Sequence, residues 1–132
     1  MTERGNSIVI IADLDADTVR QMLLFMYLDA LDKLEYESAK NLYFAADKYD
    51  IVSLKHRCSN FLKQNFLQSK CCDILLLADL HGDTDLKNVV KDYIANNGEE
   101  VLFSDDWKDL EEKEPQLTTE VFRFIYMKKR GN

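Results

Sequence analysis

Proline and glycine are scarce in this sequence, with one proline and four glycines among 132 residues. Because these two residues mark loops and turns, a loop-rich or disordered chain is not expected. Long apolar runs are also missing: runs such as residues 74–78 are far too short to cross a bilayer. The first six residues are polar, so no secretory signal peptide is expected. The hydrophobic fraction of 46% is enough for one core.

Cysteine occurs only three times, as Cys58, Cys71 and Cys72, so a closed disulfide framework is not expected. Adjacent cysteines point to different sides of a helix, which makes Cys71 and Cys72 poor joint zinc ligands. Even with His56 and His81 nearby in sequence, ordinary core thiols are the preferred interpretation. We therefore predict no metal and no cofactor, and a reducing intracellular compartment fits best.

Acidic residues outnumber basic ones by 24 to 17, which gives a formal net charge of −7. This balance argues against nucleic acid or an anionic membrane as the main partner. Catalytic motifs are also missing, since no Gly-rich phosphate loop, paired metal-ligand cluster or nucleophile motif occurs. Asp79 and His81 flank a helix end without a nucleophile, so a capping role is preferred for His81. The sequence predicts a non-catalytic protein.

Helical periodicity runs through most of the chain. It predicts helices over residues 16–28, 37–49, 51–65, 71–80 and 84–97, a short helical turn over 99–103, an acidic segment around Trp107, and a last helix that begins near Pro115. The β-branched run at residues 7–11 predicts a single strand. The fold class that we expect is mostly α, a helical array with one short N-terminal strand.

Residues 41–55 are the expected packing centre, where two helices meet at a tight corner. Three apolar stripes are predicted to face the core: Val19, Met22, Leu23, Met26 and Tyr27 on the first helix, Leu42, Tyr43, Ala46 and Tyr49 on the second, and Leu54, Cys58, Phe61 and Leu62 on the third. The first helix is so apolar that it should be buried on more than one side. Tyr36, Phe44, Phe66 and Leu67 lie off these stripes and are candidates for an interface.

The helix ends carry recognisable signals. Asp50 and Ser69 are expected to cap the helices that follow them, and Ser104 belongs to a cap-like cluster before Trp107. Gly82 and Gly98 are expected to end helices in the left-handed conformation.

Several of these stretches resemble the latter half of a BTB (POZ) domain followed by the BACK-type helices of the speckle-type POZ proteins. The resemblance is carried by Phe-Met-Tyr at 25–27, Ala-Ala-Asp-Lys-Tyr at 45–49, Ile-Leu-Leu-Leu-Ala-Asp-Leu-His at 74–81, Trp-Lys at 107–108, and Pro115. It implies a partial BTB/POZ domain over residues 1–65 and a BACK-like helical segment over residues 66–132.

The resemblance also implies a function. Members of that family are substrate adaptors of a cullin-3 RING ubiquitin ligase, in which the BTB domain dimerises and docks the cullin. Met1 and Glu3 fit the hydrophobic-x-Glu motif that anchors the cullin, and the resemblance places an extended cullin contact at Leu67, Cys71 and Leu75. It places BACK-to-BACK self-association at Phe122, with a partly exposed aromatic covering the core as the plainer alternative.

The chain begins where the family is already midway through its BTB domain. We therefore expect a truncated adaptor module without the substrate-binding MATH domain, present either as a fragment or as a shortened paralogue. The expected partners are cullin-3 and other BTB adaptor chains or a second copy of itself, in the nucleus and/or cytoplasm. The alternative is a self-association or inhibitory module that binds other BTB adaptors without recruiting a ligase.

Overall fold

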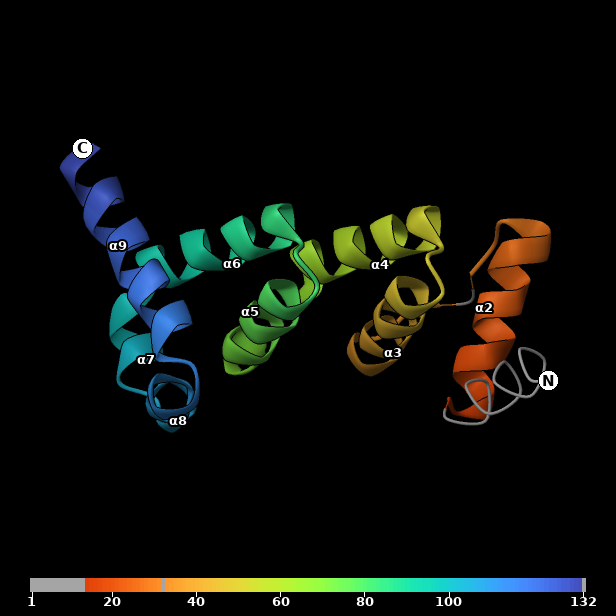
Figure 1. Ribbon diagram of the computed structural model, residues 1–132, viewed down its shortest axis with the longest axis horizontal. Helices are drawn as coiled ribbons and strands as arrows, with labels where there is room; N and C mark the ends of the chain where they lie inside the picture. Colours follow the sequence, from red (N-terminus) through yellow and green to blue (C-terminus); the bar gives the residue numbers. More distant parts are fainter. Residues whose placement is uncertain (1–13, 32, 132) are drawn as a thin grey trace. The chain divides into compact units, whose positions relative to one another are not determined.

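The computed structural model describes residues 14–31 and 33–131, which form eight α-helices and one short 3-10 helix (Figure 1). The helices are α2 (Ala16–Leu28), α3 (Tyr36–Lys48), α4 (Val52–Asn65), the 3-10 helix η1 (Gln68–Lys70), α5 (Cys71–Leu80), α6 (Thr84–Asn96), α7 (Gly98–Leu102), α8 (Asp105–Lys113) and α9 (Pro115–Gly131). The predicted helical array is therefore confirmed. The strand predicted at residues 7–11 lies outside the described residues, as do Met1 and Glu3.

The chain divides into two compact units, residues 1–62 and 63–132, and the division falls inside α4. Within the described residues, none of the helices is both long and apolar enough to cross a membrane.

In the first unit, α2 packs against α3. Leu42, Tyr43 and Ala46 of α3 are fully buried, as are Leu54, Cys58 and Leu62 of α4, so these predicted core positions are confirmed. Tyr49 and Phe61 are only partly buried. An ion pair joins the two sides of the corner, since the Lys55 ammonium lies 2.7 Å from the Asp47 carboxylate and also 5.6 Å from the centre of the Tyr43 ring.

The corner itself differs from the prediction. Asp50 was expected to cap α4, but it takes a left-handed conformation with φ of 61° and lies at the end of α3. The amide of Ile51 donates to the carbonyl of Ala46, and the carbonyl of Ile51 accepts the first hydrogen bond of α4, from Lys55. Asp50 therefore serves the turn that ends α3, a position in which aspartate is tolerated because its short side chain strains little there.

The prediction that α2 is buried on more than one side is wrong for the described unit. Its buried residues are Thr18, Gln21, Met22 and Phe25, which follow helical spacing and define a single face. Met26 and Tyr27 lie off this face and are exposed, Tyr27 by 81%. Apolar residues alone did not reveal this face, because two of its four residues, Thr18 and Gln21, are polar.

In the second unit, α6 packs against both α5 and α9, and α8 packs against α9 and α5. The largest fully buried side chain is Trp107 of α8. The other helices of the unit after η1 also contribute buried side chains to the core, as does α8 itself: Ile74, Leu75, Leu86, Val90, Ile94, Val101, Leu110, Leu117 and Val121. The only proline, Pro115, begins α9 as predicted.

Two helix-end predictions hold in this unit and two fail. Gly82 has φ of 65° and follows α5, and the Ser104 hydroxyl accepts the amide of Trp107 at the start of α8. Ser69 does not cap α5, because it lies inside η1. Gly98 is not left-handed and begins α7 instead, directly after Asn97, whose amide and side chain both donate to the carbonyl of Tyr93.

Charged side chains hold α9 against α6 and α5. The Glu120 carboxylate on α9 lies 3.2 Å from the Lys87 ammonium and also binds the ammonium of Lys91, which is buried. Lys87 makes a second ion pair at 2.8 Å with Asp79 of α5. One carboxylate thus connects two cations of a neighbouring helix, at a site that is partly open to solvent on the Glu120 side.

Candidate functional site

The segment that leads into α5 presents an exposed apolar side chain. Leu67 immediately precedes η1, has extended backbone, and is 63% exposed. Its neighbours in sequence are held in place: the Phe66 ring meets the Tyr93 ring edge to face with centroids 5.2 Å apart, and the Tyr93 hydroxyl donates to the Gln68 side chain at 3.4 Å. Leu67 is therefore displayed from a fixed turn, as expected of an interface anchor.

The other two residues predicted for this contact lie differently. Cys71 is 2% exposed and Leu75 is fully buried, so both belong to the inner face of α5. Their spacing of four residues places them on one face of the helix, together with Ile74 and Ala78. Leu67 and Cys71 both lie near the start of α5. Of the three residues predicted for this contact, however, Leu67 is the one with an exposed side chain.

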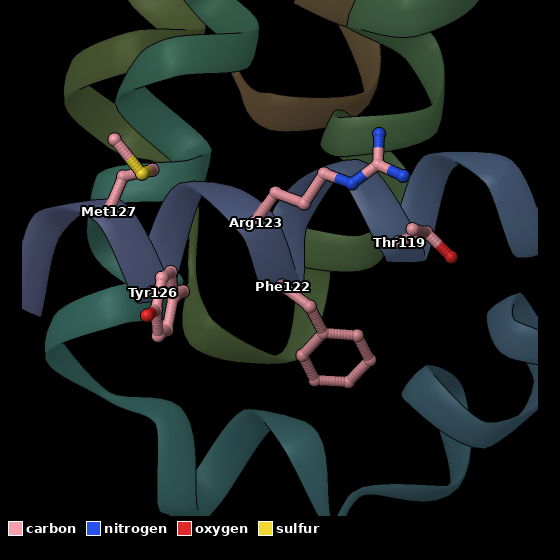
Figure 2. A pocket seen from close by; sticks show the side chains of 5 residues that line it. All are labelled: Thr119, Phe122, Arg123, Tyr126 and Met127. Carbon is pink, nitrogen blue, oxygen red and sulfur yellow. The ribbon is translucent and has the colours of Figure 1, made fainter.

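A pocket of about 340 Å³ lies on α9 and is shown in Figure 2. It is lined by Thr119, Phe122, Arg123, Tyr126 and Met127, whose side chains all project from this one helix. Their spacing of three and four residues makes them one continuous face. Phe122, the predicted self-association residue, is 42% exposed at this face, and Tyr126 and Met127 are exposed further along it.

Phe122 has a second contact that sequence reasoning did not identify. Its ring meets the buried Trp107 ring edge to face, with centroids 5.7 Å apart and planes at 82°. One part of Phe122 thus covers the core while another part lines the α9 pocket. The interpretation of Phe122 as a partly exposed aromatic that covers the core is thus confirmed, whereas its role in self-association stays a prediction.

A second pocket, of about 440 Å³, opens beside η1 and α5. It is lined by Gln68, Ser69, Cys71, Cys72, Glu100, Val101, Ser104 and Asp106. Two thiols and two carboxylates thus share one cavity. Sequence reasoning did not find this pocket, because Glu100 and Asp106 come from α7 and α8, about thirty residues after the cysteines.

The two thiols of this pocket differ in their acid–base behaviour. The neighbouring Cys72 thiol lowers the pKa of Cys71, although burial and the nearby charge of Asp106 oppose this. The neighbouring Cys71 thiol, together with burial, raises the pKa of Cys72 far above its ordinary value. Of the pair, Cys71 is therefore the thiol that loses its proton first.

A third exposed apolar surface lies on α2, where Leu23, Met26, Tyr27 and Leu28 are exposed. Among the described residues, no group of three or more His, Cys, Asp or Glu side chains is arranged to hold a metal ion. The surfaces that stand out are thus exposed apolar side chains, a feature of sites at which proteins bind other proteins.

Comparison with known proteins defines the class. Residues 1–66 match the BTB/POZ domain, and residues 71–119 match the BACK domain, described as BTB And C-terminal Kelch. Both are protein-interaction domains, so the chain contains a protein-interaction module. More particularly, the chain belongs to the BTB/POZ domain family.

Individual relatives support the same assignment. TD and POZ domain-containing protein 1 of Mus musculus is 34% identical over 126 residues, which are 95% of this chain and 34% of the relative. TD and POZ domain-containing protein 3 of the same species is 33% identical with the same coverage. Protein maternal effect lethal 26 of Caenorhabditis elegans is 29% identical over 93% of this chain and 31% of the relative. The chain thus spans about a third of the length of these curated relatives.

Proposed function

We propose that the chain is the protein-interaction part of a substrate adaptor for a cullin-3 RING ubiquitin ligase, of the kind formed by the speckle-type POZ proteins. The observation that carries the proposal is the order of the two domains, BTB over residues 1–66 and BACK over residues 71–119. In this family, BTB domains mediate self-association and cullin-3 binding. The proposed role is non-catalytic and intracellular, without nucleic acid or membrane as a partner.

Leu67 is the proposed anchor of the second contact with the cullin. It stands exposed between the two matched domains, beside a pocket whose rim carries Glu100 and Asp106. An apolar anchor with a charged rim is a common arrangement in interfaces, where the anchor supplies affinity and the charges set orientation. Cys71 and Leu75 support this surface from within, and Met1 and Glu3 supply the proposed first contact.

A binding titration with the purified amino-terminal domain of cullin-3 tests the proposal. Leu67→Asp should weaken binding about tenfold or more, because it puts a charge into an apolar contact worth at least ~1.4 kcal/mol. Leu80→Asp is the matched control: Leu80 is 69% exposed at the other end of α5. Equal loss in both variants contradicts the assignment of Leu67, and absence of binding at tens of micromolar contradicts the cullin proposal.

Self-association without ligase recruitment is the second candidate, and the apolar α9 pocket favours it. Phe122, Tyr126 and Met127 expose apolar surface along one helix face, on which a second copy or another BTB adaptor would pack. This alternative requires no contact at Leu67. A chain that binds a full-length BTB adaptor but not the cullin domain would therefore favour it.

Light scattering tests the α9 contact. Phe122→Glu and Tyr126→Glu should both lower the molar mass, while Phe103→Glu should not, since Phe103 is 74% exposed outside the pocket. Tyr126→Glu is included because Phe122 also contacts the core, so that Phe122→Glu alone could act by unfolding the chain. A lower molar mass in both variants therefore indicates loss of association. An unchanged mass in both variants contradicts the contact.

A further inference from the structure

The α9 pocket lies on a face of the helix that stays exposed, although α9 packs against α6 and α8. Phe122, Tyr126 and Met127 are 42%, 60% and 63% exposed on this face. Together with Thr119 they follow one another at steps of three and four residues. From Thr119 to Arg130 this face measures about 17 Å along the helix axis, which is long enough for a partner helix of several turns.

This face is basic, whereas the chain as a whole has a formal net charge of −7. Arg123 lines the pocket, and Figure 2 shows its side chain on the same stretch of α9 as Phe122 and Tyr126. Further along, the guanidinium of Arg130 lies 5.9 Å from the centre of the Tyr126 ring. Exposed Lys129 follows Tyr126 by one helical turn. The pocket therefore has cations at its middle and at its C-terminal end.

The other charged residues of α9 face α6 instead of the pocket. Glu120, the one carboxylate of α9, binds two lysines of α6, and Lys128 pairs with a carboxylate of that same helix. Arg123, Lys129 and Arg130 have no carboxylate partner among the residues that the structure describes. Their positive charge is thus uncompensated and attracts negative charge to the apolar face.

Two of these cations have a plainer explanation. Lys129 and Arg130 lie in the last turn of α9, where cations stabilise the helix through its dipole. Arg123 lies about two turns earlier, where the dipole has little effect, because that effect is confined to the last turn. Arg123 is therefore the cation whose position at the apolar pocket points to an acidic partner.

The charge also distinguishes between possible occupants of the pocket. Pairing of α9 with α9 of a second copy would bring Arg123 and Arg130 of both chains together without a carboxylate between them. Such like-charge contacts suppress association. A segment that carries acidic residues beside apolar ones matches both the apolar surface and its cations. This favours another protein over α9 of a second copy, and so refines the second candidate function.

We propose that the α9 pocket binds an acidic amphipathic helix of another protein. Apolar residues of that helix, at positions i, i+4 and i+7, pack on Phe122, Tyr126 and Met127. Its carboxylates, about two turns apart, pair with Arg123 and Arg130. The proposal rests on the α9 surface of the second candidate and does not depend on cullin binding.

Fluorescence anisotropy with labelled synthetic peptides tests the proposal on the 132-residue chain. One capped helical peptide of about fourteen residues has leucines at i, i+4 and i+7 flanked by glutamates, and the matched peptide has lysines in place of the glutamates. The acidic peptide should bind at least about tenfold more tightly, and the difference should shrink as salt is added. Tyr126→Ala should weaken its binding several-fold, because the apolar contact is lost.

Two charge reversals locate the contact. Arg123→Glu should weaken binding of the acidic peptide about tenfold or more and bring the two peptides closer in affinity. Lys108→Glu is the matched control, since it changes the net charge equally at an exposed position of α8 outside the pocket. Trp107 fluorescence checks that both variants are folded. Equal losses in the two variants would overturn the proposal, because net charge alone would then explain the binding.

Further outcomes also overturn it. Equal affinity for the two peptides, or no binding of the acidic peptide at about 100 μM, contradicts an acidic partner. If Phe122→Glu then still lowers the molar mass in light scattering, a second copy occupies the face and the second candidate function stands without this inference. A single-stranded oligonucleotide that binds as tightly as the acidic peptide, unaffected by Tyr126→Ala, would assign the face to polyanions.

Discussion

Trp107 and Phe122 pack edge to face, with ring centroids 5.7 Å apart and an angle of 82° between their planes. This contact joins α8 to α9 and connects the core of the second unit with the pocket on α9. The indole nitrogen of Trp107 also donates to the Glu111 carboxylate at 3.2 Å, so that the single tryptophan is fixed at both ends. Its fluorescence therefore reports on the second unit alone.

The first prediction concerns the strength of this ring contact. Phe122→Leu should lower the free energy of unfolding by about 1 kcal/mol, because an edge-to-face pair contributes roughly 0.5–1.5 kcal/mol beyond its buried area. Urea unfolding followed by Trp107 fluorescence at low protein concentration measures the loss. Phe103→Leu serves as the control, since exposed Phe103 should change stability by less than about 0.5 kcal/mol. An equal loss of unfolding free energy in Phe122→Leu and Phe103→Leu would mean that the Trp107–Phe122 ring contact does not stabilise the fold.

The second prediction is a pH dependence at Glu120. Its hydrogen bond with Lys91, followed by that with Lys87, holds the pKa of the carboxyl below its ordinary value of 4.5 against the effect of burial. A carboxyl with a lowered folded pKa stabilises the fold above the unfolded pKa, and this contribution is lost as the pH falls through the folded value. Glu120→Gln should therefore destabilise at pH 7, and the difference from wild type should shrink toward pH 3.

The size of that effect should be modest. The Glu120 side chain is 42% exposed, so solvent screens it and we expect less than about 1 kcal/mol at pH 7. Urea unfolding at both pH values gives the difference. Glu112→Gln, at an exposed position of α8, corrects for the general change in net charge. A pH-independent loss in Glu120→Gln would point to packing instead of charge.

The third prediction compares two glycines. Gly82 has φ of 65° and open space around its missing Cβ, so Gly82→Ala should cost about 1–2 kcal/mol through backbone strain alone. At Gly98 an added Cβ would meet Leu102 Cδ1 at 3.6 Å, an ordinary contact, and the backbone is not left-handed. Gly98→Ala should thus be neutral or stabilise by up to about 1 kcal/mol. Thermal unfolding of both variants measures the change: the unfolding temperature should fall in Gly82→Ala and should stay the same or rise in Gly98→Ala.

The sequence was a good guide where a local rule decides the structure. The start of α9 at Pro115, the left-handed stop at Gly82 and the buried faces of α3 and α4 all follow from residues close in the chain. It was a poor guide where distant residues decide. Nothing local shows which side of the apolar α2 is covered, so Met26 and Tyr27 were assigned to the core although they are exposed.

The sequence likewise indicated some of the candidate surfaces and missed others. Leu67 was singled out because it lies off the apolar stripes and Phe122 because of the family resemblance, and both are exposed in the structure. Their roles in binding remain predictions. The thiol pocket was missed because its acidic lining comes from α7 and α8, whereas Cys71 had been considered as a core thiol, as a poor zinc ligand and as a contact for a partner protein. Sequence spacing reveals a shared helix face, but it does not reveal a cavity assembled from three helices.

The last prediction uses two serines that look alike in the sequence. Ser104 accepts the amide of Trp107 at 3.2 Å and donates to the Val101 carbonyl at 2.7 Å, so Ser104→Ala should cost about 1 kcal/mol. Ser69 also comes just before a predicted helix, yet it lies exposed inside η1, and Ser69→Ala should stay within about 0.5 kcal/mol of wild type. Urea unfolding followed by Trp107 fluorescence measures both. A loss at Ser69 as large as that at Ser104 would show that the start of α5 depends on the Ser69 hydroxyl, which the hydrogen bonding described for this turn does not require.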